Sequence, residues 1–578
     1  MLTSYGDLVA LFADLPLTVS DSGSDSAQLS VPYAALRHLQ RQLGDEPLVA
    51  DPEMLRSLLE LCAIADPCLF HVMFLHHCMT IGNALDQGAS EADVTALASG
   101  RWIGAALMTE LGHGNSSAGI RTEAVYDDDA REFVLHTPTR DAVKHPASVG
   151  LDGIARLGIV SARLIVHGVD RGTALFLVAL RDEAGPCPGV TITPRSRTPL
   201  LPMDYAAVEL VGVRVPYSRW LSDGASIAED GIFQDPLDGP DARSRRSVAM
   251  SRFAWGAVTV ALAAVARASA VLALTHARQR RTFDRLAGEV TALEHLNQQR
   301  LLFGALASAL AATVVARQVT QRCWHIPMGG GRGSGPSAPM MRELALAKVT
   351  VDVLADGAVD RCRSACGALG FFEENRLIGY QALTMAFQSG GGDNRLILLD
   401  GAWVMATSQD CLPDADAAPD EWVRRFRERE RLLHAELVAA ISGDVDGAVP
   451  FAVWNAQTEL AQRFAEAHTT RTTVEALHEE WFGPAAAGAS RPLLGDLYRL
   501  HCLEQVSAHA GWYLAHGLLT SQEVLALPSS INEICGRLVG NVDPLVELAD
   551  VPERLRAGTN TLLAGADWAS AGRQRMPT

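Results

Sequence analysis

Three glycine-rich turns hold most of the residues that could bind or polarise a flat ligand. They read TELGHG (109–114), ACGALGFF (365–372) and SGGGDN (389–394). Glycine lets a backbone approach a ligand closely, and the threonine hydroxyl and backbone amides of such turns can donate hydrogen bonds. Each turn alone could simply connect two elements. Because three of them interrupt otherwise regular segments, we predict one composite binding cleft.

A run of arginines could add an anion-binding function. The segment LTHARQRRTFDR (274–285) places Arg278, Arg280, Arg281 and Arg285 at the expected end of a helix. A solvated charged surface is the ordinary interpretation, but such a cluster could also clamp a pyrophosphate. The segment MGGGRGSGPSAP (328–339) lacks the lysine and preceding strand of a phosphate-binding loop, so it predicts a connection between helices.

The elements around these turns follow from hydrophobic spacing. Apolar residues recur every three or four positions over 35–43, 52–64 and 68–85, which predicts helices. Short alternating runs between 122 and 221 predict an antiparallel β domain, and long helical patterns resume at 243. We therefore expect an N-terminal helical domain (1–107), a central β domain (108–222), a helical bundle (240–410) and a C-terminal helical domain (420–578).

Composition excludes several classes of function. The 578 residues are 48% hydrophobic and carry a net charge of −18, which disfavours nucleic-acid or anionic-membrane binding. The ten cysteines show no CxxC pair or metal-ligand spacing, which indicates reduced thiols and no metal site. Arg267 interrupts the longest apolar run, Phe253–Leu274, so we expect a buried bundle helix and no membrane span.

Several motifs together resemble the acyl-CoA oxidase branch of the acyl-CoA dehydrogenase superfamily. TELGHG resembles the family's flavin-contacting segment, and RRTF (280–283) with LNQQRLLF (296–303) resembles its helical bundle. LGDLYRLHCLEQ (494–505) and VDPLVELADVPERLR (542–556) resemble the oxidases' additional C-terminal domain. The resemblance implies an α+β fold, mainly α: an N-terminal helical domain, a central antiparallel β domain, a helical bundle and an extra C-terminal helical domain.

The same resemblance implies an FAD enzyme that acts on an acyl thioester. Thr109 and Gly114 would lie at the isoalloxazine ring, and Arg280 would reach the FAD pyrophosphate of a neighbouring subunit. Gln298 and Gly367 would contact the adenosine side, while Asp393 and Asn394 would close the site beside the flavin. The remaining cofactor-binding residues that the matched motifs imply are Lys144, Phe283 and Gly370.

One departure from the family pattern concerns the general base. In the oxidases a glutamate in a Y-E-G-D/E-N motif removes the α-proton, and here Gly391 stands at its position. Ser251 stands at the alternative position used by some relatives, and His145 replaces a tryptophan expected against the flavin. Gly391 keeps a backbone N–H that could polarise the thioester carbonyl. His145 and Glu373 are candidate replacement bases, although bracing or surface roles are the commoner ones for such residues.

Three hypotheses follow. The chain is an FAD-dependent oxidase or dehydrogenase with a displaced base, a flavin-dependent oxygenase that uses dioxygen, or a non-catalytic homologue that pairs with an active subunit. Retention of Thr109, Arg280 and Asn394 favours a bound flavin. CoA and acyl carrier protein are equally compatible carriers. We expect a homodimer, and a cytoplasmic location because the end RQRMPT is not the peroxisomal signal S-K-L; the alanine- and arginine-rich composition is typical of a bacterium.

Overall fold

The computed structural model describes residues 5–13, 15, 17, 25–114, 119–248, 251–328, 337–408, 412–442, 449–484, 490–556 and 562, with the backbone alone for Ala13, Val248 and Ser251. These residues form two compact units. Unit 1 comprises 1–261 and 320–341, and unit 2 comprises 262–319 and 342–578. Helices α8 (Ser251–Gln279), α9 (Leu296–Cys323) and α10 (Ala338–Ala365) each continue from one unit into the other.

Unit 1 begins with helices, as the apolar spacing predicts. They are α1 (Tyr5–Ala13), α2 (Asp25–Leu43), α3 (Pro52–Ala65), α4 (Pro67–Met73), a π-helix (Phe74–Ile81), α5 (Gly82–Asp86) and α6 (Glu91–Ala98). Asp51 and Asp66 accept backbone N–H bonds at the starts of α3 and α4, each followed by a proline at the first helical position. Helix boundaries here are therefore fixed by local chemistry.

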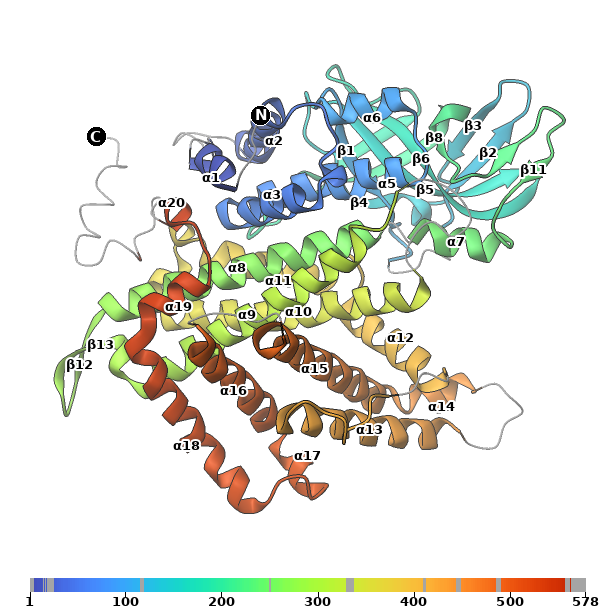
Figure 1. Ribbon diagram of the computed structural model, residues 1–578. Helices are drawn as coiled ribbons and strands as arrows, with labels where there is room; N and C mark the ends of the chain where they lie inside the picture. The colour runs from blue at the N-terminus through green and yellow to red at the C-terminus, as the bar shows by residue number, and fades with distance from the viewer. Residues whose placement is uncertain are drawn as a thin grey trace, which may run out of the picture. The chain divides into compact units, whose positions relative to one another are not determined.

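The strands of unit 1 form a sheet of nine, with the order β4-β8-β3-β2-β5-β6-β9 (Figure 1). In addition, β1 pairs with β5 and β7 pairs with β8. The strands are β1 (Ile103–Leu107), β2 (Glu123–Asp127), β3 (Glu132–His136), β4 (Lys144–Ser148), β5 (Arg156–Val166), β6 (Val169–Arg181), β7 (Val190–Pro194), β8 (Tyr205–Pro216) and β9 (Trp220–Leu221). A small pair, β10 (Ser226–Ile227) and β11 (Phe233–Gln234), and helix α7 (Pro240–Val248) follow.

The sheet is mixed, whereas the sequence predicts an antiparallel one. Strands β1 and β2 both run parallel to β5, pairing with its residues 156–160 and 163–165 respectively. All other described pairings in the sheet are antiparallel. Because β1 and β2 are both parallel to β5, they run in the same direction. The first strand also begins at Ile103, inside the range expected to be helical.

Unit 2 contains long helices and one hairpin. After α8 come the strands β12 (Arg281–Asp284) and β13 (Gly288–Thr291), then α9, α10, α11 (Leu377–Phe387) and α12 (Asn394–Thr407). The C-terminal part, brown to red in Figure 1, has α13 (Glu421–Ile441), α14 (Phe451–Asn455), α15 (Thr458–Phe482), α16 (Arg491–Ala508), α17 (Ala510–Ala515), α18 (Ser521–Leu538), α19 (Val542–Leu548) and α20 (Glu553–Arg556). Helices α12, α13 and α15 share one apolar core, which includes Leu398, Leu433 and Phe464.

Among the residues that the structure describes, three helical segments are long and apolar enough to cross a membrane by length and composition alone. They are Pro67–Asp86, Pro240–Gln279 and Leu296–Cys323. The share of the most apolar window that is buried inside the protein is 83%, 100% and 72%, respectively. This burial is what the interpretation of Phe253–Leu274 as a bundle helix predicts.

Candidate functional site

The first glycine-rich turn, 109–114, is fastened to the segment 141–145 by hydrogen bonds. The Thr109 hydroxyl donates to the His145 carbonyl at 2.6 Å, and the His145 N–H donates to the Thr109 carbonyl at 3.0 Å. The Leu111 N–H donates to the Val143 carbonyl at 2.9 Å. A Cβ at Gly112 would lie 2.6 Å from the Asp141 Cβ, so this close approach requires glycine. The structure thus brings together Thr109 and His145, two predicted site residues 36 positions apart.

A buried ion pair between Glu110, in this turn, and Lys144 stabilises the turn. Lys144 Nζ lies 2.9 Å from Glu110 Oε1, and both side chains are fully buried. Glu110 also accepts the Thr122 hydroxyl at 2.6 Å and the Arg121 and Thr122 N–H groups at 2.9 Å each. Burial alone would raise the pKa of Glu110, but Lys144 and these donors hold it below its usual range. Glu110 and Lys144 are therefore braces of the turn.

Two predicted residues remain accessible at this turn. Gly114 is exposed, and a Cβ there would meet no atom of the described residues within 4 Å. His145 is partly buried, and burial followed by the charge of Arg195 lowers its pKa. His145 is therefore neutral at pH 7 and able to accept a proton. The turn consequently offers open backbone and a neutral imidazole to a ligand.

The second glycine-rich turn, 367–371, belongs to unit 2 and packs closely against its neighbours. Gly367 has φ of +61°, and a Cβ there would lie 3.4 Å from Nη1 of Arg280. The same Nη1 donates to the Ala365 carbonyl at 3.5 Å, at the end of α10. A Cβ at Gly370 would lie only 2.3 Å from the Arg363 carbonyl oxygen. The structure thus brings together Arg280 and Gly367, with an exposed guanidinium that can meet an anion.

Replacing Gly370 with alanine is expected to destabilise unit 2 by about 1–3 kcal/mol, because the new methyl group would clash with backbone. Gly357 on α10 supplies a matched control, since a Cβ there would meet nothing within 4 Å. Gly357→Ala should be neutral or stabilising by up to about 1 kcal/mol, as alanine is the better helix former. The urea midpoints of both variants test this. Equal midpoints would show that the close approach at Gly370 is unimportant.

Two more predicted cofactor residues of unit 2 lie on strand β12 and on helix α9. Phe283 on β12 is 81% exposed. Oε1 of Gln298, near the start of α9, is buried and has no hydrogen-bonding partner among the residues that the structure describes. An unpaired buried amide oxygen is costly unless a donor reaches it, and the exocyclic amino group of an adenine is such a donor. Together with Arg280 and the close glycine turn, these residues fit an adenine dinucleotide.

The backbone conformation of the third glycine-rich turn, 389–394, requires its glycines. Gly391 and Gly392 have φ of +68° and +101°, where residues with a Cβ are strained. A Cβ at Gly390 would lie 2.8 Å from the Ala386 carbonyl oxygen, so the aromatic residue of the family motif would not fit here. Asp393 then starts α12 as its N-cap and accepts the Arg395 N–H at 2.9 Å. The turn is thus a tight connection between α11 and α12.

A lysine that sequence reasoning missed holds this turn in place. Lys348 on α10 is fully buried, and its ammonium donates to the carbonyls of Phe387 and Gly392 and to Asn394 Oδ1, the last two at 2.9 and 2.8 Å. The Asn394 amide in turn donates to Asp352 Oδ2 at 2.6 Å. Burial lowers the pKa of Lys348 to about 8 and raises that of Asp352 to about 6. Asn394 therefore links the turn to two buried ionisable groups.

The other candidate bases have separate positions. Glu373 begins a 3-10 turn, Glu373–Asn375, and is exposed; its carbonyl accepts the Arg376 N–H at 2.9 Å. Among the described residues no hydrogen bond or ion pair joins Glu373 to the turn at 389–394. Ser251 is the first residue of α8, but its side chain lies outside the described part of the chain. The prediction of Glu373 as a base thus gains no geometric support.

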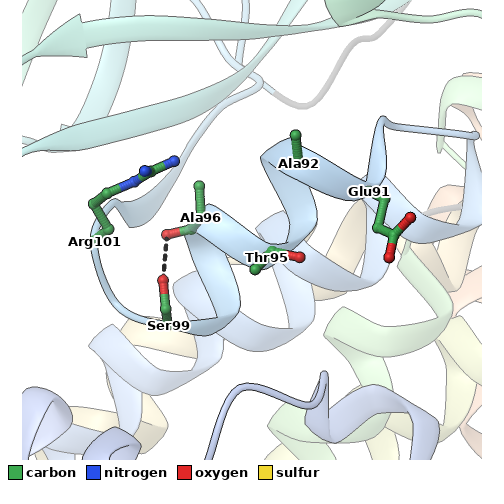
Figure 2. Close-up of a pocket in the computed structure, with 6 residues that line it drawn as sticks. All are labelled: Glu91, Ala92, Thr95, Ala96, Ser99 and Arg101. Carbon is green, nitrogen blue, oxygen red and sulfur yellow. Dashed lines mark hydrogen bonds between the residues drawn. The ribbon is translucent and has the colours of Figure 1, made fainter.

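A shallow pocket on unit 1 lies at helix α6. Figure 2 shows its lining, with the side chains of Glu91 and Arg101 at opposite ends. The other lining residues are Ala92, Thr95, Ala96 and Ser99, and the Ser99 hydroxyl donates to the Ala96 carbonyl at 3.4 Å. None of the predicted site residues lines this pocket.

Comparison with known families agrees with these features. Residues 249–405 match the model of the "Acyl-CoA oxidase, C-alpha1 domain", and residues 419–555 match that of "Acyl-CoA oxidase". Together the two models cover just over half of the chain. The chain belongs to the acyl-CoA oxidase family.

Similar proteins extend the match over most of the chain. A mouse acyl-coenzyme A oxidase-like protein is 25% identical over 523 residues, covering 82% of this chain and 80% of the relative. Human peroxisomal acyl-coenzyme A oxidase 3 is 24% identical over 569 residues, covering 88% and 80%. Among solved structures, acyl-CoA oxidase-2 of Caenorhabditis elegans bound with FAD, ascaroside-CoA and ATP has a TM-score of 0.83 at 19% identity, covering 99% of this chain and 91% of that one. The predicted α+β fold is confirmed.

Proposed function

We propose that this protein is an FAD-dependent oxidoreductase of acyl-CoA oxidase type that acts on an acyl thioester. The support is its family membership together with a retained set of residues that fit the cofactor. Human peroxisomal acyl-coenzyme A oxidase 3 is a relative over most of the chain, and a similar fold is known with FAD and an acyl-CoA bound. Retention of this set speaks against a non-catalytic homologue.

Each unit carries residues that the matched motifs assign to cofactor binding. In unit 1 they are Thr109 and Gly114; in unit 2 they are Arg280, Gln298 and Gly367. Arg280 would pair with the FAD pyrophosphate of a neighbouring subunit, and Gln298 would accept a hydrogen bond from an adenine. When bound, the flavin supplies the acceptor for a hydride from the substrate's β-carbon.

The glycine turn at 389–394 carries the second part of the proposal. Gly391 retains the backbone N–H that would polarise the thioester carbonyl. Lys348 holds this turn in place by donating a hydrogen bond to the Gly392 carbonyl. Gly391 has no carboxylate, so the α-proton must leave to another group or be acidic in the substrate itself. His145, neutral at pH 7, is the remaining candidate base in unit 1. Loss of a general base alone costs about 10²–10⁴ in rate.

Anaerobic mixing of the purified holoprotein with a panel of acyl-CoAs tests this function, with the oxidised flavin absorbance as the readout. Bleaching by at least one acyl-CoA is the expected result. If the flavin binds but stays oxidised with every acyl-CoA and every carrier-protein thioester, the proposed oxidation of an acyl thioester is contradicted. That result would favour an oxygenase whose flavin receives electrons from another donor. The observation behind that alternative is the glycine at 391. Protein isolated without any flavin would restore the non-catalytic hypothesis.

His145→Gln distinguishes the two sources of proton removal. If His145 is the base, the rate of bleaching should fall by about 10²–10⁴ and lose its dependence on pH below about 6.5. If the substrate's own acidity suffices, bleaching should persist at a similar rate. The homodimer, the use of dioxygen, the choice of CoA or carrier protein, the cytoplasmic location and the bacterial source are further parts of this proposal.

A further inference from the structure

A buried arginine in the C-terminal part of unit 2 has no contacting counter-ion. Arg429 on α13 is 3% exposed, and its Nε and Nη1 are buried without a hydrogen-bonding partner among the described residues. Burial lowers the pKa of this guanidinium, yet arginine stays protonated at neutral pH. A buried charge without a partner is strongly unfavourable. An anion bound beside the guanidinium would offset this unfavourable burial of charge.

The groups around Arg429 could complete such a site. Its Cζ lies 5.7 Å from the centre of the Trp512 ring, a cation–π distance. The neighbouring Tyr513 is fully buried, and its hydroxyl also lacks a partner among the residues that the structure describes. The Trp512 ring is next to both groups, because its centre lies 5.7 Å from Cζ of Arg429 and 5.4 Å from the centre of the Tyr513 ring. Two buried groups with unpaired polar atoms thus lie next to the same ring.

No neighbouring carboxylate neutralises Arg429 by direct contact in the described structure. Glu466 on α15 attracts it from a distance but accepts the Gln462 amide at 2.9 Å, and Arg463 repels it. Arg425 also lies near Tyr513, but it pairs with Glu421 and Glu523, and Arg463 pairs with Glu459. His509 supplies no charge, because burial lowers its pKa to about 4. The charge of Arg429 itself is therefore left without a contacting carboxylate among the described residues.

We propose that Arg429 and Tyr513 form a binding site for one small anion, of the size of a halide or a compact carboxylate. The guanidinium would donate through Nε and Nη1, the phenol would donate its O–H, and the Trp512 ring would cover one side. Burial of both donors excludes bulky anions. This site is separate in its residues from the proposed flavin and thioester residues. A bound anion here would stabilise α13 against α17 (Ala510–Ala515).

Thermal unfolding of the full-length protein in increasing chloride tests the proposal, with gluconate replacing chloride to keep the ionic strength constant. Chloride should raise the melting temperature of the wild type by about 2–4 °C, saturating with concentration. Arg429→Met should abolish the response, and Tyr513→Phe should weaken it. Arg431→Met is the matched control, because Arg431 lies on the same helix but is exposed and pairs with Glu428. That variant should respond as the wild type does.

Crystals of the wild-type protein grown with bromide provide a second test that does not depend on a variant folding. An anomalous peak at the Arg429 guanidinium is expected. Formate in place of chloride separates a carboxylate site from a halide site by which of the two shifts the melting temperature at lower concentration. No bromide peak, with equal chloride responses in the wild type and Tyr513→Phe, would overturn the proposal and leave water as the partner of both donors.

Discussion

Lowering the pH from 7 to 5 is expected to cost the protein several kcal/mol of stability through histidines that are buried as neutral rings. Burial lowers the pKa of His71, His501 and His509 to about 4, and that of His77 to about 3. In the unfolded chain each of them titrates near pH 6.5. Below that pH the unfolded state binds protons that the folded state does not bind, so the free energy of unfolding decreases as the pH falls.

The size of the effect follows from the number of protons. Each group contributes about 1.4 kcal/mol per pH unit once the pH is below 6.5 and above its folded pKa. Asp352 acts in the opposite direction, because its pKa is raised to about 6 and protonation favours the folded state. Four histidines against one carboxyl predict a slope of about 4 kcal/mol per pH unit between pH 6 and 5. His76 steepens the slope further, because burial lowers its pKa well below the usual value. Urea unfolding at pH 7, 6 and 5 measures it.

His77→Phe should reduce this slope. Neither ring nitrogen of His77 has a hydrogen-bonding partner in the described structure, so phenylalanine removes a proton site with little loss of bonding. The variant should lose about 1.4 kcal/mol per pH unit from the slope. Identical slopes in the wild type and His77→Phe would contradict the argument.

Much of the fold could be predicted from the sequence because local spacing determines it. The helices at 52–65 and 67–86 follow from apolar periodicity and from aspartate caps. The parallel pairing of β1 and β2 with β5 could not be predicted, because alternation of apolar residues shows that a segment is a strand and not which edge it meets. Strand direction is decided by the path of the whole chain.

The candidate site was predictable to a similar degree. The turns at 109–114, 365–372 and 389–394 stand out by their glycines, and the pairing of Thr109 with His145 agrees with the resemblance that singled out both. The positive φ of Gly391 and Gly392 is a property of the folded turn. Lys348 was missed because it lies 44 residues before the Gly392 carbonyl that it contacts. Its one local signal is the spacing of four to Asp352 on the same helix.

Replacing Lys348 with methionine is expected to lower kcat/KM on an acyl thioester by about 10²-fold while the protein retains flavin. Lys348 fixes the carbonyls of Phe387 and Gly392 and the Asn394 side chain, and so positions the turn whose backbone would polarise the substrate. Loss of one oxyanion-type donor typically costs about 10²–10³ in kcat. Lys348 touches no reacting atom in this scheme, so it is a positioning residue.

Thr350→Val is the matched control for Lys348→Met, because the Thr350 hydroxyl bonds only within α10, to the Leu346 carbonyl at 2.9 Å. It should leave both kinetic constants near those of the wild type. Asn394→Ala breaks the same network from the other side and should reproduce the loss. A merely structural role for Lys348 would lower the melting temperature without changing kcat below it. If Lys348 positions the turn for the transition state alone, its loss should instead lower kcat and leave KM unchanged. That is the result that the positioning role requires.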